Sequence, residues 1–143
     1  MKVKDLMTDK VVKVSTDDTV LKAALLMRHW DIGAVPVELD GHFAGIITDR
    51  DITLRCVAED IKSDQVKAGD IMTSEHLVSI SPEHSVIEAA RIMAREQIRR
   101  LPVCENGRIV GMLSLGDLAA AKKMFSETAA AFCDISEKKK KKY

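Results

Sequence analysis

The chain has 143 residues, enough for one ordinary domain or for two small units that bury a core. Aromatic residues make up only 3% of it, which disfavours nucleic-acid binding by base stacking. Without the lysine run at 138–142, 17 basic residues stand against 22 acidic ones, a net charge of −5. Because duplex backbones are bound by clustered Lys and Arg, we expect no nucleic-acid partner.

The sequence also predicts a cytoplasmic protein without membrane contact. No apolar run is long enough to span a bilayer, and the first ten residues lack the apolar core of a secretory leader. The three cysteines are far apart and form no C-x-x-C pair, which fits thiols in a reducing compartment.

Two short motifs open what is a duplicated pattern. Asp5 to Thr8 reads D-L-M-T, and Asp70 to Thr73 reads D-I-M-T. An apolar run follows each, at 11–14 and at 77–80, and each predicts a strand. Duplication at a fixed spacing indicates a repeat architecture.

A helix is predicted next in each copy. Hydroxyl and carboxylate side chains at 15–19 and 81–85 precede apolar periodicity, which is typical of a helix start. Apolar residues then recur at i, i+3, i+4 and i+7, which indicates one buried stripe per helix. The stripes are Val20, Ala23, Ala24 and Met27 in the first copy, and Val86, Ala89, Ala90 and Met93 in the second.

A hairpin is predicted after each helix. An X-Pro pair favours extended backbone and opens the segments Val35-Pro36-Val37 and Leu101-Pro102-Val103. The dipeptides Asp40-Gly41 and Asn106-Gly107 are strong turn signals. The returning strands lead into G-I-I-T-D-R-D at 45–51 and G-M-L-S-L-G-D at 111–117, 66 residues apart. A second helix should begin at Thr48 and at Ser114.

These elements predict a mixed α/β (α+β) fold built from two β-α-β-β-α repeats. Because neither copy can bury both faces of its sheet, we expect the repeats to pack sheet to sheet with pseudo-twofold symmetry. The expected boundaries are repeat 1 at 1–60, a polar linker at 61–69 and repeat 2 at 70–133 with a long C-terminal helix. A disordered lysine-rich tail is expected at 134–143.

The ordered set of motifs, in duplicate from Lys4 to Ala121, resembles a tandem pair of CBS domains, also called a Bateman module. The resemblance implies a regulatory module, not an enzyme, with no resident cofactor. It implies binding of an adenine-containing nucleotide between the repeats (AMP, ADP, ATP or S-adenosylmethionine), homodimer formation and signalling to an unidentified regulated protein. The alternative is an interaction scaffold with degenerate nucleotide clefts.

The resemblance also implies which residues contact the ligand. Asp51 and Asp117 match the family aspartate that accepts hydrogen bonds from ribose hydroxyls, and Thr48 and Ser114 stand where a phosphate can be met. The segments Val35-Pro36-Val37 and Leu101-Pro102-Val103 would line the cleft. A second interpretation stays open, because T-x-x-D and S-x-x-D at a helix start also form a capping box.

Basic residues differ between the two copies. Arg50 lies inside the first motif, where the second has Gly116. Arg99-Arg100-Leu101-Pro102-Val103 resembles the H-R-[LI]-P-V of nucleotide-sensing members such as the γ subunit of the AMP-activated kinase, with Arg99 in place of the histidine. The resemblance implies phosphate contacts for these arginines; the alternative is that they are solvated side chains at a helix end.

The remaining candidates are structural. The four histidines, His29, His42, His76 and His84, lack metal-ligand spacing, so no metal site is predicted. Trp30 closes the first helix and is expected in the core or in a dimer interface. An apolar stripe on the last helix predicts the homodimer interface, and its members are Leu118, Met124, Phe125 and Phe132.

Overall fold

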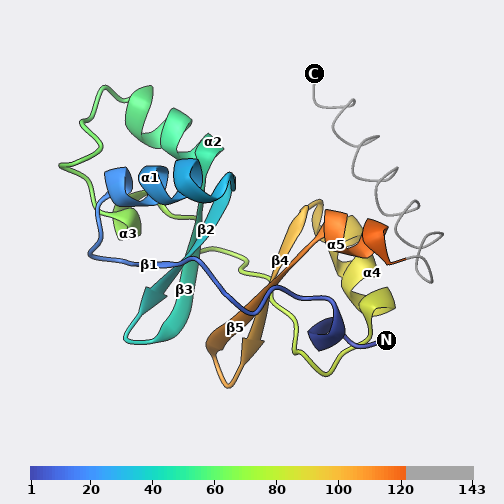
Figure 1. The fold of residues 1–143 in the computed structure, drawn as a ribbon. Helices are drawn as coiled ribbons and strands as arrows, with labels where there is room; N and C mark the ends of the chain where they lie inside the picture. The colour runs from blue at the N-terminus through green and yellow to red at the C-terminus, as the bar shows by residue number, and fades with distance from the viewer. Residues whose placement is uncertain (122–143) are drawn as a thin grey trace. The chain divides into compact units, whose positions relative to one another are not determined.

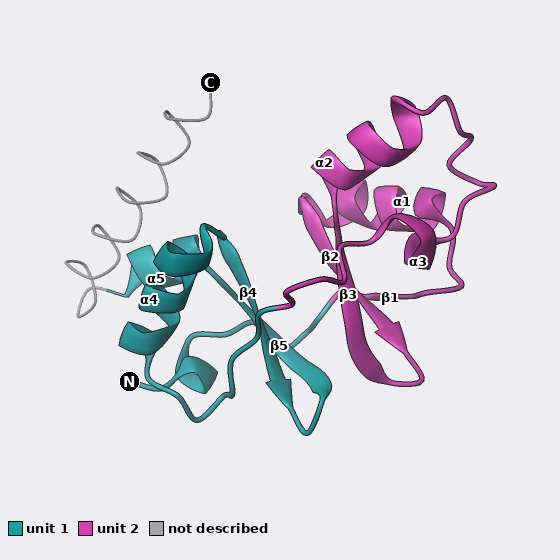
Figure 2. Ribbon diagram, turned by 180° about the vertical axis from the view of Figure 1, so that it is seen from behind, with its two compact units in different colours: residues 1–11, 78–143 teal, residues 12–77 magenta. Residues whose placement is uncertain are grey.

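The structure is a computed structural model that describes residues 1–121. The chain forms two compact units, coloured separately in Figure 2. Unit 2 is Val12–Leu77, whereas unit 1 combines Met1–Val11 with the chain from Val78 onward. The units therefore do not follow the order of the repeats, because the first eleven residues belong with the second repeat.

Unit 2 is a small sheet covered by helices (Figure 1). Strand β1 runs parallel to β2, and β2 is antiparallel to β3. In chain order the elements are β1 (Val14–Ser15), α1 (Val20–Trp30), β2 (Ala34–Leu39), β3 (His42–Thr48), α2 (Asp49–Ile52), the π-helical turn η2 (Thr53–Val57) and α3 (Ala68–Ile71).

Unit 1 repeats this plan. Antiparallel strands β4 and β5 form its sheet, and Ile80 makes a single parallel bridge to Val103 where β1 lies in unit 2. The elements are the 3-10 turn η1 (Val3–Asp5), α4 (Val86–Glu96), β4 (Arg100–Glu105), β5 (Arg108–Ser114) and α5 (Leu115–Ala120). The mixed α/β fold of two β-α-β-β-α repeats is thus confirmed, although the first strand of each is shorter than predicted.

Local sequence signals account for the helices and turns. The hydroxyls of Thr19 and Ser85 each accept a backbone N–H three residues later, at 3.1 Å, and so cap α1 and α4. Both predicted hairpin turns have positive φ at their two central residues, 51° and 78° at Asp40-Gly41 and 53° and 77° at Asn106-Gly107. This is the type I′ geometry that such dipeptides favour.

The predicted stripes build two separate hydrophobic cores, one in each unit. Val20, Ala23 and Met27 are buried beneath α1, and the four stripe residues of α4 are all buried. Val35 and Val37 complete the core of unit 2, as Leu101, Val103 and Leu113 complete that of unit 1. Among residues 1–121, no residue belongs to both cores.

The N-terminal segment, residues 1–11, is fixed to unit 1 by its backbone and by one apolar side chain. The N–H of Val3 donates to the carbonyl of His84 at 2.9 Å, and that of Lys4 donates to Pro82 at 3.0 Å. The Val3 side chain is 0% exposed and lies in the core of unit 1. Glu83 adds two ion pairs on the surface, to Lys2 at 2.5 Å and to Lys4 at 2.8 Å.

This surface cluster predicts an acid-sensitive contact. Hydrogen bonds from Lys2 and Lys4 lower the pKa of Glu83 from 4.5 to about 2. A lowered pKa stabilises the folded form above the ordinary pKa, and that stabilisation disappears as the pH falls from 4.5 towards about 2. We expect the Val3 amide resonance to shift in this window, and Glu83→Gln to remove the shift. An unchanged profile in Glu83→Gln would contradict the assignment.

The core alternative for Trp30 and the exposed placement of Leu118 are wrong. Trp30 is 57% exposed, so it is not a core residue; it contacts the ring of His29 edge-on, with centroids 5.1 Å apart. Leu118 is 0% exposed and lies in the core of unit 1, so it cannot form an exposed interface stripe. The rest of that stripe, Met124, Phe125 and Phe132, lies outside the described residues, as do the predicted long helix and lysine tail.

Cys56 and Cys104 are free thiols. Within residues 1–121 no helix is long and apolar enough to cross a membrane.

Candidate functional site

In unit 2 the first motif lies where strand β3 passes into helix α2. The Thr48 hydroxyl accepts the backbone N–H of Asp51 at 3.1 Å, and Asp51 Oδ2 accepts the N–H of Thr48 at 3.0 Å. These reciprocal bonds form the capping box that the sequence left open as an alternative. Capping is therefore an observed role of Thr48 and Asp51.

The second motif has the same geometry in unit 1. The Ser114 hydroxyl accepts the N–H of Asp117 at 3.0 Å, and Asp117 Oδ2 accepts the N–H of Ser114 at 2.7 Å. Helices were predicted to begin at Thr48 and Ser114, and both positions are helix N-caps. In both units Oδ2 of the aspartate caps the helix, and Oδ1 takes no part in the cap.

The D-h-M-T motifs complete these two sites, each in the unit of the opposite repeat. Thr73 pairs with Ile46 of β3 through two backbone hydrogen bonds of 2.9 and 2.8 Å. Thr8 pairs with Met112 of β5 through two bonds of 2.9 Å. Unit 1 therefore needs the N-terminal segment to extend its sheet beside Asp117, as unit 2 needs residues 71–73 beside Asp51.

The motif glycines allow this close approach. A Cβ atom on Gly45 would lie 2.9 Å from Met72 Cγ and 3.0 Å from the Thr73 carbonyl oxygen. On Gly111 it would lie 3.0 Å from Met7 Cγ and 3.1 Å from the Thr8 oxygen. The nearest atom to each added Cβ is the sulfur of the covering methionine, Met72 Sδ or Met7 Sδ, so an alanine at either glycine would force that methionine side chain to shift and would crowd the backbone oxygen beside it.

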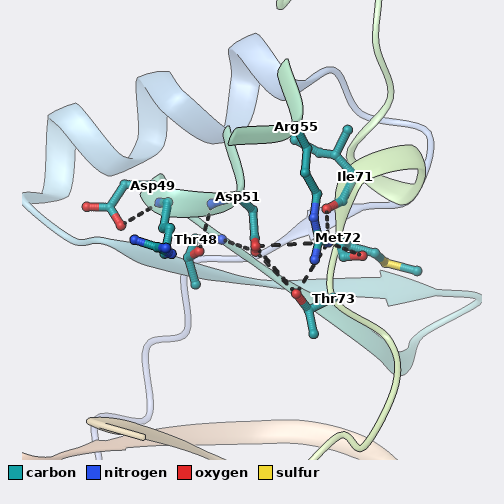
Figure 3. A network of polar contacts seen from close by, with 8 residues as sticks. Thr48, Asp49, Asp51, Arg55, Ile71, Met72 and Thr73 are labelled. Atoms are coloured by element: carbon teal, nitrogen blue, oxygen red, sulfur yellow. Dashed lines mark hydrogen bonds and ion pairs between the residues drawn. The ribbon is translucent and has the colours of Figure 1, made fainter. Parts of the chain in front are cut away.

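A polar network surrounds Asp51 (Figure 3), and within residues 1–121 Asp117 has no such network. The Thr73 hydroxyl lies 3.5 Å from both carboxylate oxygens of Asp51. Arg55 Nη1 lies 3.9 Å from Asp51 Oδ1 and donates to the carbonyl oxygens of Ile71 at 2.9 Å and Met72 at 3.4 Å. The network joins the start of α2 to the segment 71–73.

Sequence reasoning missed Arg55. The available signal was its position four residues after Asp51, a spacing at which an acid and a base on a helix face one another. The hydrogen bonds to 71–72 have no such local signal, because they join residues 16 and 17 positions apart.

The predicted arginines fall into two groups. Arg100 stands directly opposite Ser114 in the β4–β5 pair, and the carbonyl of Arg99 accepts the N–H of Leu115 at 2.9 Å. Directly opposed residues of an antiparallel pair share one face of the sheet. The structure thus brings Arg100 to the motif of its own unit. Arg50 is exposed on α2, and its backbone N–H donates to Asp49 Oδ1 at 2.9 Å.

The two Pro-containing segments are part of the sheets. The side chains of Val35, Val37, Leu101 and Val103 are each 0% exposed, and Pro36 and Pro102 are buried. A ligand contact by these segments would therefore use their backbone. All four histidines are exposed, and among residues 1–121 no three His, Cys, Asp or Glu side chains gather as a metal site.

Comparisons with known proteins agree with this arrangement. The profile of the CBS domain matches residues 3–57 and 68–123. The CBS domain-containing protein YhcV of Bacillus subtilis is 40% identical over 134 residues, which are 94% of this chain and 94% of that protein. Both the matched family and this relative are described by the CBS domain alone, and neither indicates a catalytic role.

Solved structures show the same fold. The crystal structure of Hypoxic Response Protein I, with two coordinated zinc ions, matches with a TM-score of 0.77 and 30% identity over 85% of this chain and 98% of that one. The CBS domain pair of protein MJ0100, in complex with 5′-methylthioadenosine and S-adenosyl-L-methionine, has a TM-score of 0.72 and 24% identity over 84% and 94% of the two chains.

Two consecutive matches to one domain profile cover most of the chain, and the duplicated motifs form the same capped turn in both units. The chain therefore belongs to the CBS domain family and carries two CBS domains, the pair that forms a regulatory ligand-binding module.

Proposed function

We propose that this chain is a regulatory module that binds an adenine-containing nucleotide at its motif aspartates and signals the binding to a partner protein. The ligand class is AMP, ADP, ATP or S-adenosylmethionine. One observation carries the proposal. Asp117 Oδ2 caps α5, whereas Oδ1 has no hydrogen-bond partner among residues 1–121, although the side chain is half-buried.

The chemistry of that oxygen fits a sugar. An ionised carboxylate only accepts hydrogen bonds, and two oxygens can receive several at once. A vicinal diol such as ribose presents two adjacent O–H donors, and dinucleotide-binding folds use a carboxylate for the same purpose. A free acceptor oxygen on a side chain already fixed by a cap would meet a diol without further ordering.

The arginines would serve the phosphates. Arg100 stands opposite Ser114 in the β4–β5 pair, so its side chain leaves the sheet on the same face as the second motif. Charge-assisted bonds from arginine to phosphate are about twice as strong as neutral ones. Arg99, and Arg50 in the first motif, are exposed cations that can contribute in the same way.

The solved MJ0100 complex gives limited support. At 24% identity the likeness concerns the fold, so the complex indicates only that a CBS pair can hold adenosyl compounds. Free Cys56 and Cys104 fit a reducing compartment, and a cytoplasmic location is part of the proposal.

Equilibrium binding of AMP, ADP, ATP and S-adenosylmethionine to the purified chain tests the proposal. Asp117→Asn should weaken the binding of any bound nucleotide about tenfold to a hundredfold, because a bond to a charged acceptor contributes about 1.5–3 kcal/mol. Asparagine keeps an acceptor for the Ser114 N–H, so thermal stability should change little. Loss of stability with unchanged affinity would leave Asp117 as a cap alone.

The alternative function is a ligand-free interaction scaffold, and one surface of unit 2 favours it. Five large apolar side chains on α1, η2 and the following loop are exposed. This apolar face consists of Leu21, Leu25, Leu54, Val57 and Ile61, which are 38–67% exposed. Absence of binding for all four nucleotides would favour the scaffold.

The apolar face also supports the proposal of a homodimer, since large exposed apolar patches mark interaction sites. We expect Leu25→Glu to weaken self-association at least about tenfold, because a charge would be buried at the interface. Analytical ultracentrifugation across micromolar concentrations measures it. Leu39→Glu is the control, because Leu39 is 52% exposed but lies at the hairpin end of β2. A wild-type monomer would rule the dimer out.

A further inference from the structure

The two motif aspartates differ in how many donors they already hold. Asp51 receives the Thr48 N–H, faces the Thr73 hydroxyl at 3.5 Å and pairs with Arg55 at 3.9 Å. Asp117 receives the Ser114 N–H at 2.7 Å and has no other described partner within residues 1–121. The same capped turn is therefore an engaged acceptor in unit 2 and an available one in unit 1.

Arg55 is held in place by groups other than Asp51. Its Nη1 donates to the Ile71 carbonyl at 2.9 Å, which is a better bond than its 3.9 Å approach to Asp51 Oδ1. Arg55 follows α2 in the π-helical turn η2, where Ala58 donates to the Thr53 carbonyl at 2.9 Å. The guanidinium thus stays beside Asp51 because the chain fixes it from the 71–73 side.

Among residues 1–121, unit 1 shows no equivalent of this arrangement. The position 66 residues after Arg55 is Ala121, which is buried and carries no charge. Thr8, the counterpart of Thr73, pairs through its backbone with Met112, and its side chain has no described hydrogen bond within residues 1–121. The difference between the two aspartates therefore follows from one sequence position, which is Arg55 in the first copy and Ala121 in the second.

We propose that Asp117 forms the tighter site for a vicinal diol, and that Arg55 is the residue that weakens the site at Asp51. Arg55 acts through Asp51: its positive charge, 3.9 Å from Oδ1, competes with a sugar hydroxyl for that oxygen. This inference rests on the proposed function and deepens it, because it orders the two sites and names the residue that sets the order.

Adenosine is the probe, because it has the diol and lacks the phosphates that Arg50, Arg99 and Arg100 would attract. A titration followed by the backbone amide resonances of Asp51 and Asp117 gives one dissociation constant for each unit. We expect the Asp117 signal to saturate first. Asp117→Asn should remove the tighter event, whereas Asp51→Asn should remove the weaker one.

Arg55→Met tests the cause. In the Asp117→Asn background it should strengthen adenosine binding at Asp51 about 1.5-fold to fivefold, the range expected for loss of one exposed ion-pair competitor. Lys22→Met in the same background is the matched control, since it removes an i,i+4 ion pair of unit 2, to Asp18 at 3.1 Å, that does not involve Asp51. Unchanged adenosine binding in Arg55→Met would overturn the role proposed for Arg55. Weaker binding would overturn it as well, because it would show that Arg55 contacts the ligand.

The outcomes separate this inference from the proposed function. If wild-type protein binds adenosine at neither unit, this inference falls, whereas the proposed function falls only if AMP, ADP, ATP and S-adenosylmethionine also fail to bind. If adenosine binds and the Asp51 signal saturates first, or Asp51→Asn removes the tighter event, only the site order is overturned. Hydrogen exchange without ligand tests the network around Asp51 itself. Arg55→Met should speed exchange at the Thr73 amide and leave the Thr8 amide unchanged. The same Thr73 rate in the variant and the wild type would contradict the role of Arg55 in the network.

Discussion

Val3→Asp is expected to unfold unit 1 while unit 2 stays folded. Val3 is 0% exposed in a core that also contains Val86, Leu101 and Leu118. Burying an unpaired carboxylate there costs more than about 4 kcal/mol, a large share of the about 5–15 kcal/mol that a small domain has. Unit 2 should survive because the two cores share no residue.

Hydrogen exchange resolved by residue measures this difference. Amides of α4 and β5 should lose protection in Val3→Asp, and those of α1 and β2 should keep it. Lys2→Ala with Lys4→Ala is the matched control, since it removes both ion pairs to Glu83 and leaves the buried side chain in place. Equal loss of protection in the two units would show that they unfold as one, contrary to the prediction.

The elements with local causes could be predicted from the sequence. The 66-residue spacing gave the duplication, hydroxyls before apolar periodicity gave the starts of α1 and α4, and Asp-Gly and Asn-Gly gave the turns. Each depends on residues within a few positions of one another. The same locality made the capping box at Thr48 visible before its geometry was known.

The features that depend on distant pairs could not be predicted. Nothing in residues 5–8 indicates that they pair with β5 more than 100 positions later and not with a strand of their own repeat. Such pairing is a non-local contact set by the whole fold. For Trp30 only the core alternative was wrong: α1 ends at Trp30, and Asp31 turns the chain with a φ of 53°, so the buried stripe does not continue to this residue.

The residues of the candidate site also divide into those with a local sequence signal and those whose contacts join distant segments. The aspartates and hydroxyls were located by their motif, and their reciprocal bonds are now observed. The difference between the two copies was sought in Arg50 and Gly116, and in Arg99 and Arg100 of the second copy. The structure adds a second difference at Arg55, whose hydrogen bonds run to carbonyl groups of another segment. Whether the motif residues bind a nucleotide stays a prediction.

Gly111→Ala is expected to destabilise unit 1 by about 1–3 kcal/mol, the usual cost of overpacking a filled contact. The new Cβ would lie 3.1 Å from the Thr8 carbonyl oxygen, which is fixed by its bond from Met112, and 3.0 Å from Met7 Cγ. Gly116→Ala is the matched control in the same motif. Its nearest neighbour is Ser114 Oγ at 3.6 Å, so alanine should fit and stabilise helix α5 by about 0.5 kcal/mol.

Urea unfolding measures the free energy of unfolding of the two variants. If residues 7–8 lie on β5 as described, Gly111→Ala should lower it and Gly116→Ala should raise it. Adding Met7→Ala to Gly111→Ala should recover part of the loss, because the side-chain half of the clash disappears and only the backbone half remains. The double-mutant cycle therefore yields a coupling between Met7 and position 111, as expected for residues in contact.

Gly45→Ala with Met72→Ala should repeat the pattern in unit 2, where the corresponding distances are 3.0 Å to Thr73 O and 2.9 Å to Met72 Cγ. If Gly111→Ala costs no more free energy of unfolding than Gly116→Ala, the N-terminal segment does not cover β5. The site beside Asp117 would then lack the residues that this segment contributes to it.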